Sequence, residues 1–449
     1  MLRVSEKKHN FMGRTTFMIQ TLFLFFADKT SDANPIFTND AIVLGLLMLI
    51  LAGIFYTHSL KTNFWQTFYR YVPALLLCYF LPALLNWPLN LASGDVSQLY
   101  FVASRYLLPA SLVLLCLAID FKGIIRLGPK ALIMFFAATF GIILGGPIAI
   151  LFVKWVAPDV IPVSMDELWK GMSTIAGSWI GGGANQTAMK EIFEVPDNLF
   201  GTMIIVDVVV ANIWMAFLLY GANISDRVDK VLKADNSAIK DLEKRMSDYS
   251  ESVKKTPTMT DTIVLLGVAF GVVALAHFGS DIIAPAVGKH EAFLEKFKLQ
   301  SLSSGFFWLI VIATTVGVGL SFTRFRKLEG VGATRIGSVF IYILVATIGL
   351  KMNLGEVFNN LGLFAIGIVW MLIHIAILLL VAKLIRAPFF FVAVGSQANV
   401  GGAASAPIVA SAFNPSLASV GILMAVLGYA LGTYGAIICA QLMNLAAGG

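Results

Sequence analysis

Two polar stretches interrupt this strongly apolar sequence, and each opens with Gly-Ser and continues through glycines and small residues. The first, Gly177–Ile192, reads GSWIGGGANQTAMKEI, and the second, Gly395–Pro407, reads GSQANVGGAASAP. Glycine weakens a helix, and any backbone N–H or C=O that it frees needs a partner where water is absent. In many transporters such a break occurs once per half and holds the substrate and the coupling ion. Close packing of small residues is the simpler alternative, but the pairing and the polar neighbours favour a binding site.

Asp207 lies deep within an unbroken apolar run, MIIVDVVVANIWM. A carboxylate at that depth costs free energy unless it is paired, protonated or hydrated, so function is the default hypothesis. We expect Asp207 to hold the coupling ion, either sodium or a proton. The alternative is a structural acid bonded to a neighbouring helix break. Asn212 follows in the same run and could border the same cavity.

The breaks predict two kinds of binding group. Carbonyls before each break suit a small cation, and to the ion we assign the side chains of Asp207, Asn212, Ser178, Ser396, Gln397 and Asn399. Half-helix N-termini after each break offer N–H groups and partial positive charge to an anion. To the solute we assign Gly182, Gly183, Asn185, Gln186, Thr187, Gly401, Gly402 and Ser405, with Thr433 and Tyr434 as weaker candidates. For each side chain, the alternative role is repair of broken backbone hydrogen bonds.

Three further features have structural interpretations. Ser405 followed by Pro407 predicts a helix start, with a capping hydroxyl and a proline in the first turn. Lys190 and Glu191 are expected to pair locally or to reach the outer surface. His374, alone in WMLIHIAILL, is interpreted as a hydrogen-bonded packing residue rather than a proton relay.

Composition indicates an integral membrane protein, because 58% of the 449 residues are apolar, 13% are charged, and apolar runs of spanning length recur. The formal charge of +6 does not suggest nucleic acid, since the basic residues cluster in short loops. The three cysteines lie in apolar runs without CxxC spacing, and neither HExxH nor GxxxxGK[ST] occurs. No disulfide framework, zinc site or nucleotide motor is therefore expected, and a bound sodium ion is the one cofactor considered.

The apolar segments form two sets of six around a polar linker. We expect an N-terminal segment of uncertain role at 1–38, a first membrane repeat at 39–222, a cytoplasmic linker at 223–260 and a second repeat at 261–449. The first set comprises 41–57, 72–85, 99–119, 131–153, the broken 168–193 and 199–222. The second comprises 261–278, 306–322, 335–350, 361–385, the broken 388–412 and 416–443.

Charge indicates how the broken segments run. If each enters and leaves on the same side, most basic residues after Ser59 become cytoplasmic, as the positive-inside rule favours. Each half then has five crossings and one re-entrant hairpin, and the second half is inverted relative to the first. Broken helices that cross fully are the alternative. Arg105, near the start of the third segment, is interpreted as a residue that snorkels to the interface.

These motifs resemble the domain-of-unknown-function 819 family of multi-spanning membrane proteins. The resemblance rests on TNDAIVLGLLML at 38–49, GSWIGGGANQTA at 177–188, VDVVVAN at 206–212 and SQANVGGAASAP at 396–407. That family is grouped with the cation/proton antiporter and anion transporter superfamily. The resemblance implies inverted repeats, broken helices that meet at mid-membrane, and often a homodimer with an elevator-type movement. Sodium/proton antiporters typically carry adjacent acidic residues beside the break, whereas Asp207 has valines on either side, which favours sodium-coupled symport.

The sequence therefore predicts an all-α membrane protein of two inverted repeats, each with a glycine-broken or re-entrant fifth segment. We expect a secondary active transporter of the bacterial inner membrane that couples sodium or protons to the movement of a small organic solute. An anionic solute is expected rather than a cationic one. One alternative is cation/proton exchange without an organic solute, and another is a membrane sensor that binds a ligand without moving it. An enzyme is not expected, because paired intramembrane aspartates, a zinc motif and a nucleophile elbow are missing from the sequence.

Overall fold

The computed structural model describes residues 35–72, 74–125, 127–234, 257–296, 300–352, 362–414 and 417–448. These residues form helices, and no strand occurs among them. The predicted all-α fold is therefore confirmed for the described chain. The predicted N-terminal segment up to residue 34 and the linker positions 235–256 lie outside the described residues.

The chain divides into two units, Met1–Phe101 with Val345–Val357 and Val102–Leu344 with Phe358–Gly449. The first unit contains α2 (Asp40–Ser59), α3 (Asn63–Tyr71) and α4 (Ala74–Asn86), and α2 packs against the other two. The unit boundaries fall in α5 (Leu99–Val102) and α16 (Ala333–Gly349). The predicted division into two repeats around a linker stays a prediction.

The second unit holds the remaining helices of the described chain. Their bounds are η1 (Ala103–Leu107), α6 (Leu108–Leu117), α7 (Phe121–Ile125), α8 (Pro129–Val156), η2 (Pro158–Val160), α9 (Met165–Ile192), α10 (Asp197–Asn223), α11 (Ser225–Leu232), α13 (Met259–Gly288), α14 (Glu291–Lys296), η3 (Gln300–Ser303), α15 (Gly305–Ser321), η4 (Arg324–Val331), α18 (Leu363–Ile385), α19 (Phe389–Val400), α20 (Gly402–Phe413) and α21 (Ala418–Ala447).

Among the described residues, seven helices are long and apolar enough to cross a membrane, or up to nine if each of two bent pairs is one span. The seven are α2, the continuous helix Leu99–Leu117, α8, α10, α13, α18 and α21. The bent pairs are α3 with α4 and α15 with η4, and α16 is a shorter apolar helix. The protein is thus an integral multi-pass membrane protein. Neither α9 nor the α19–α20 pair is among these spans.

Local sequence signals fix several helix starts. α9 begins with a capping box, in which Ser164 Oγ accepts from the Glu167 N–H and the Glu167 carboxylate accepts from the Ser164 N–H. Thr258 and Asp261 form the same reciprocal pair at the start of α13. Each box satisfies two N–H groups that the first helical turn leaves unpaired. α8 starts instead with Pro129, whose missing N–H costs nothing there.

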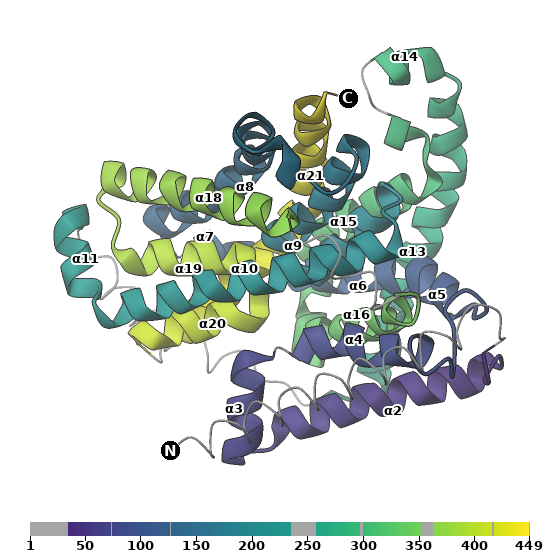
Figure 1. Cartoon of the computed structure of the whole chain (residues 1–449). Helices are drawn as coiled ribbons and strands as arrows, with labels where there is room; N and C mark the ends of the chain where they lie inside the picture. Colours follow the sequence, from purple (N-terminus) through teal and green to yellow (C-terminus); the bar gives the residue numbers. More distant parts are fainter. Residues whose placement is uncertain are drawn as a thin grey trace, which may run out of the picture. The chain divides into compact units, whose positions relative to one another are not determined.

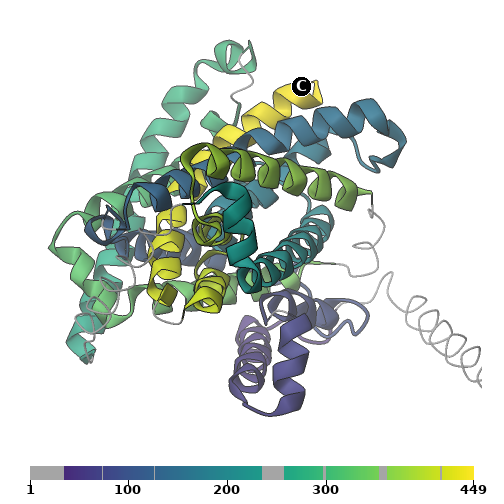
Figure 2. The same ribbon diagram turned by 90° about the vertical axis from the view of Figure 1, so that its left-hand side faces the viewer.

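The helices that carry the glycine-rich stretches share one core in the second unit. α9 packs along α21, and α8 packs against α18, α19 and α21. Figure 1 shows α19 beside α20, with α10 and α18 next to them. Figure 2 shows the C-terminal end of α21 beside α8. The helices that surround both glycine-rich stretches therefore come from two separate parts of the sequence, residues 129–223 and 363–447.

Candidate functional site

The first glycine-rich stretch forms a re-entrant hairpin, called here the first hairpin, which is α9 folded back on itself. The backbone reverses at Gly182, whose φ of 75° and ψ of −174° are not helical. The rings of Trp169 and Phe193, at the two ends of α9, lie 5.3 Å apart. A straight helix would separate them by roughly 36 Å. The two ends of α9 therefore lie next to each other, so this segment cannot run from one side of a membrane to the other.

The second stretch forms a matching structure, called here the second hairpin, from α19 and α20. Its backbone turns at Gly401 and Gly402, and Gly402 has a φ of 57° that favours glycine. The rings of Phe390 and Phe413, near the two ends, lie 5.3 Å apart. Of the two topologies that the sequence left open, the re-entrant one holds for both segments.

The tips of the two hairpins converge on one glycine of α21. A methyl group built on Gly428 would lie 2.6 Å from the carbonyl oxygen of Ile180 and 3.6 Å from that of Ala398. Ile180 ends the first arm of the first hairpin, and Ala398 lies near the end of the first arm of the second. Since the last carbonyls of a helical arm lack intrahelical donors, the convergence brings two sources of partial negative charge together.

Asp207, on α10, fastens the two arms of the first hairpin to each other. Its Oδ2 accepts from Ser178 Oγ at 2.6 Å on one arm and from Gln186 Nε2 at 3.0 Å on the other. Its Oδ1 accepts from Trp179 Nε1 at 2.7 Å. The carboxylate is buried. These three donors replace water for a charged group, which offsets the cost of burying it.

Asn185 and Thr187, which we assigned to the solute, bond to protein atoms. Asn185 Nδ2 donates to the carbonyls of Gly181 at 3.0 Å and Tyr429 at 3.4 Å, and its Oδ1 accepts from Thr433 Oγ1 at 2.6 Å. Thr187 Oγ1 donates to Gly183 within its own arm at 2.8 Å. Both side chains are buried. These contacts match the alternative role given above, in which the side chains repair backbone hydrogen bonds that the break leaves open.

The backbone of the first tip is more open than these side chains. Gly182 and Gly183 are half-buried. Among the described residues, a methyl group on Gly183 would meet only Ile341 Cγ2, at 4.0 Å, and one on Gly182 only Tyr429 Cε1, at 3.7 Å. Neighbouring atoms therefore crowd these two glycines less than they crowd Gly177 or Gly181 of the same helix.

Ser396 holds the corresponding place in the second hairpin but has neutral partners. Its hydroxyl accepts from Trp214 Nε1 at 2.8 Å and lies 2.8 Å from His374 Nε2. All three residues are buried. His374 therefore makes the packing hydrogen bond that we expected.

Asn399, also of the second hairpin, ties α19 to α8. Its Nδ2 donates to the carbonyls of Phe135 at 3.2 Å and Gly395 at 3.0 Å. Its Oδ1 accepts from Thr139 Oγ1 at 2.8 Å. Asn399 thus has a role in the second hairpin like that of Asn185 in the first.

Gln397 spans the second tip, and here one expectation is wrong. α20 begins at Gly402, so Ser405 is not its cap and Pro407 lies inside the helix. The positive φ of Gly402 completes the turn earlier than the Ser-Ala-Pro pattern suggested. Ser405 Oγ instead accepts from Gln397 Nε2 at 2.6 Å. Gln397 Oε1 is buried and has no hydrogen-bond partner among the described residues.

Asn212 is not joined to these groups, because its Nδ2 donates to the carbonyl of Val208 at 2.7 Å within α10. In the described part of the chain, no group of three or more His, Cys, Asp or Glu residues is placed to bind a metal ion. A sodium ion would instead require carbonyl and side-chain oxygens. The carboxylate of Asp207 has about four lone-pair positions and three donors on them.

Sequence reasoning named Thr433 of α21 as a weaker candidate, but it missed Trp179 and the glycines of α21. Trp179 directly follows Ser178, so the motif that indicated the site also contained this donor. Gly428 and Gly432 have the small-xxx-small spacing that permits close helix packing in membranes. A methyl group on Gly432 would lie 2.5 Å from Gly181 Cα. That spacing could have identified α21 as the partner of the first hairpin.

Comparison with known proteins agrees with the sequence motifs. Residues 45–445 match the family described as "Protein of unknown function (DUF819)". The chain is 25% identical over 355 residues to the "Uncharacterized membrane protein YjcL" of Bacillus subtilis (strain 168), an alignment that covers 75% of this chain and 82% of that protein. The family match spans most of the sequence, including both hairpins and Asp207. This membrane protein therefore belongs to the DUF819 family.

Proposed function

We propose that this protein is a secondary active transporter that couples sodium or protons to the movement of a small organic anion. The observation that carries the proposal is the convergence of two re-entrant hairpin tips at Gly428, with a buried carboxylate fastening one of them. Irregular backbone at membrane depth is tolerated where it lines a site, and transporters use such breaks for ions and substrates.

Asp207 would couple the ion to the shape of the first hairpin. A cation or proton at Asp207 competes with Ser178 and Gln186 for the same oxygen, Oδ2. These donors come from opposite arms, so ion binding would change how firmly the arms are held together. A ligand shifts a conformational equilibrium only through differential contacts with the two states, and this shared oxygen supplies such a difference.

The solute would bind where the second arms begin. The open backbone at Gly182 and Gly183 and the N-terminus of α20 offer partial positive charge, which suits a carboxylate or a similar anion. Gln397 Oε1 offers an acceptor that can orient a polar group of the solute. We further propose an elevator-type movement of the hairpin core, a homodimer and a location in the bacterial inner membrane.

The first experiment measures the thermal unfolding of the detergent-purified protein in sodium against potassium across pH, for the wild type and Asp207→Asn. Selective stabilisation by sodium that disappears in the variant supports sodium coupling, because a ligand that binds only the folded state raises its stability. A pH response that disappears in the variant supports proton coupling. Ion responses that persist unchanged in Asp207→Asn contradict an ion site at this residue.

Transport itself is tested in proteoliposomes with an imposed sodium or proton gradient. Gradient-driven uptake of a radiolabelled organic anion from a panel of mono- and dicarboxylates supports symport. Sodium-dependent proton flux without any organic anion would favour cation/proton exchange instead. Ligand-dependent stabilisation with no flux under any gradient would contradict transport and favour a sensor.

A further inference from the structure

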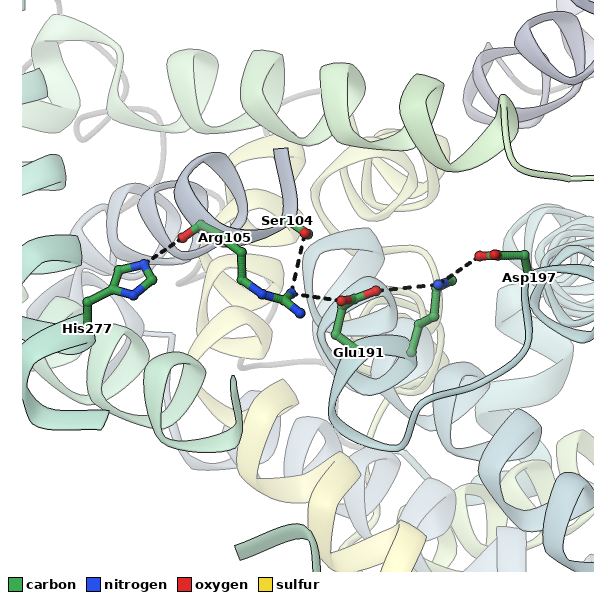
Figure 3. A network of polar contacts seen from close by, with 6 residues as sticks. Ser104, Arg105, Glu191, Asp197 and His277 are labelled. Atoms are coloured by element: carbon green, nitrogen blue, oxygen red, sulfur yellow. Dashed lines mark hydrogen bonds and ion pairs between the residues drawn. The ribbon is translucent and has the colours of Figure 1, made fainter. Parts of the chain in front are cut away.

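Four charged side chains of alternating sign form a chain at the open end of the first hairpin (Figure 3). Arg105 Nη1 donates to Glu191 Oε2 at 2.8 Å. Lys190 Nζ lies 3.4 Å from Glu191 Oε1 and 2.9 Å from Asp197 Oδ1. Glu191 and Lys190 end α9, Asp197 starts α10, and Arg105 belongs to η1. The transport site described above uses none of these groups.

Arg105 is fixed to a different set of helices from Glu191. It lies in η1, a single π-helical turn in which the Leu108 N–H donates to the carbonyl of Ala103. Pro109 has no N–H to donate to the carbonyl of Arg105, and His277 Nε2 of α13 lies 3.0 Å from that oxygen. π-helical turns of this kind are frequent at functional sites.

The side chain of Arg105 also contacts α15, because its guanidinium lies 4.4 Å from the ring centroid of Phe306. Arg105 is therefore held by α13 and α15. Glu191, Lys190 and Asp197 belong to the first hairpin and the helix that follows it. The Arg105–Glu191 ion pair joins these two sets of helices.

Both partners have other contacts if this ion pair opens. Glu191 keeps Lys190 as a nearby cation, so its buried carboxylate does not lose all of its counter-charge. Arg105 is 32% exposed and keeps the ring of Phe306 and Ser104 Oγ, at 3.3 Å. Breaking a buried ion pair is costly when it leaves an unpaired charge. Here neither charge is left alone, so the contact can open and close at a smaller cost.

We propose that the Arg105–Glu191 ion pair is a latch that closes the open end of the first hairpin and opens during the transport cycle. Glu191 exchanges Arg105 for Lys190 as its main partner when the latch opens. The inference rests on the transport function proposed above, since the latch would control access to the proposed site from one side of the membrane. It gives η1 a specific task, which is to present Arg105 to the hairpin.

The test measures access to the hairpin tip rather than transport alone. Gly183→Cys introduces a thiol where only Ile341 lies within 4.0 Å, and the three native cysteines are buried. A membrane-impermeant maleimide is added to right-side-out and to inside-out vesicles, and its labelling rate is compared with that of protein without the new cysteine. Arg105→Gln and Glu191→Gln are each combined with Gly183→Cys.

We expect each latch variant to raise the labelling rate from one face by roughly tenfold, as a population shift toward the open state requires. The double exchange Arg105→Glu with Glu191→Arg should bring the rate back toward that of Gly183→Cys alone. Asp166→Asn is the matched control, because Asp166 forms an exposed pair with Lys170 at 2.6 Å on the same hairpin. It should leave the labelling rate unchanged.

Labelling rates in Arg105→Gln and Glu191→Gln equal to that of Gly183→Cys would overturn the latch. A rise in Asp166→Asn as large as in the latch variants would also overturn it, because the effect would then come from charge loss in general. Each variant is first required to keep the ion-dependent thermal stabilisation of the wild type, and the double exchange provides a second route if a single variant does not. Solute flux is measured in wild-type vesicles, because Gly183 is assigned to the solute. A changed labelling rate in the latch variants without flux in wild-type vesicles would show that the ion pair controls access to the tip while contradicting transport, so the two failures are distinguishable.

Discussion

The two re-entrant hairpins both turn at glycines but differ in the charge at their arms. In the first hairpin, Ser178 donates to the carboxylate of Asp207, which also holds the opposite arm through Gln186. In the second, Ser396 meets the neutral side chains of Trp214 and His374, and the arms are joined by Gln397 and Ser405. The two hairpins thus turn at similar glycine-rich stretches, but of their two matched serines only Ser178 bonds to a carboxylate.

This difference suggests a division of labour between the hairpins. Under the proposed function, a carboxylate whose bonds compete with a cation would make the first hairpin sensitive to the coupling ion. The second hairpin has a buried amide oxygen without a partner in the described part of the chain, which suits the proposed solute contact better than charge compensation. The four predictions below test whether the hairpins differ in ion response while depending similarly on packing.

The largest effect is expected where α21 touches each hairpin. A methyl group on Gly432 would lie 2.5 Å from Gly181 Cα of the first hairpin, and one on Gly421 would lie 2.6 Å from Ala406 of the second. Because these neighbours are backbone atoms, Gly432→Ala and Gly421→Ala should each lower the free energy of unfolding by about 3 kcal/mol. Thermal unfolding in detergent measures this loss. Gly267→Ala, with nothing within 4 Å, is the control, and an equal loss there would contradict the packing explanation.

A smaller but more selective effect is expected at Asp207. Asp207→Asn places an amide NH₂ among three donors, from Ser178, Trp179 and Gln186. At least one donor then loses its acceptor, which should cost about 2 kcal/mol. Calorimetry with and without sodium measures both this loss and the ion response. A variant that is destabilised yet keeps the full ion response would assign Asp207 a structural role only.

The two matched serines provide the sharpest comparison. Ser178→Ala and Ser396→Ala each remove one buried hydroxyl and should each cost about 1 kcal/mol of stability. Only Ser178→Ala should change the sodium or pH midpoint of stabilisation, because only Ser178 bonds to the carboxylate. Titration of both variants under identical conditions measures the difference. Equal shifts of the midpoint in both would remove the distinction between the hairpins.

The smallest effect on stability is expected at Gln397. Gln397→Met removes the bond to Ser405 but also removes the buried oxygen that lacks a partner, so the free energy of unfolding should change by less than about 1 kcal/mol. Solute-dependent stabilisation should nevertheless weaken, whereas the ion response should not. Thermal shift with each anion of the mono- and dicarboxylate panel checks this. Unchanged solute affinity would place the solute away from the second tip.

Much of the fold could be read from the sequence, because apolar length and glycine position are direct physical signals. The predicted segments correspond to helices or bent pairs, and both glycine-rich segments are interrupted at the glycines. The inversion of one repeat relative to the other stays a prediction. From the sequence, only the distribution of basic residues indicated whether each broken segment forms a hairpin or crosses the membrane. The answer depends on tertiary contacts, such as the one between Trp169 and Phe193, that no local pattern encodes.

The candidate site was only partly accessible from the sequence. Ser178 and Asp207 were named separately, but their bond joins positions on two helices whose packing no local pattern encodes. The start of α20 was misplaced because Ser405 and Pro407 resemble a cap, whereas the positive φ of Gly402 decides the turn. Arg105 was interpreted as snorkelling, because its partner Glu191 is distant in sequence. Local signals thus identified residues, and tertiary contacts decided their partners.

The location of the carboxylate also has an electrical consequence. If Asp207 moves through the membrane field while ionised, each elementary charge that crosses fully gains or loses about 2.3 kcal/mol per 100 mV. A bound monovalent cation cancels that charge, whereas the neutral contacts around Ser396 carry none. Membrane voltage would then act differently on the proposed carrier with and without its ion, and Asp207, on α10 beside the first hairpin, would set which step of the cycle the voltage drives.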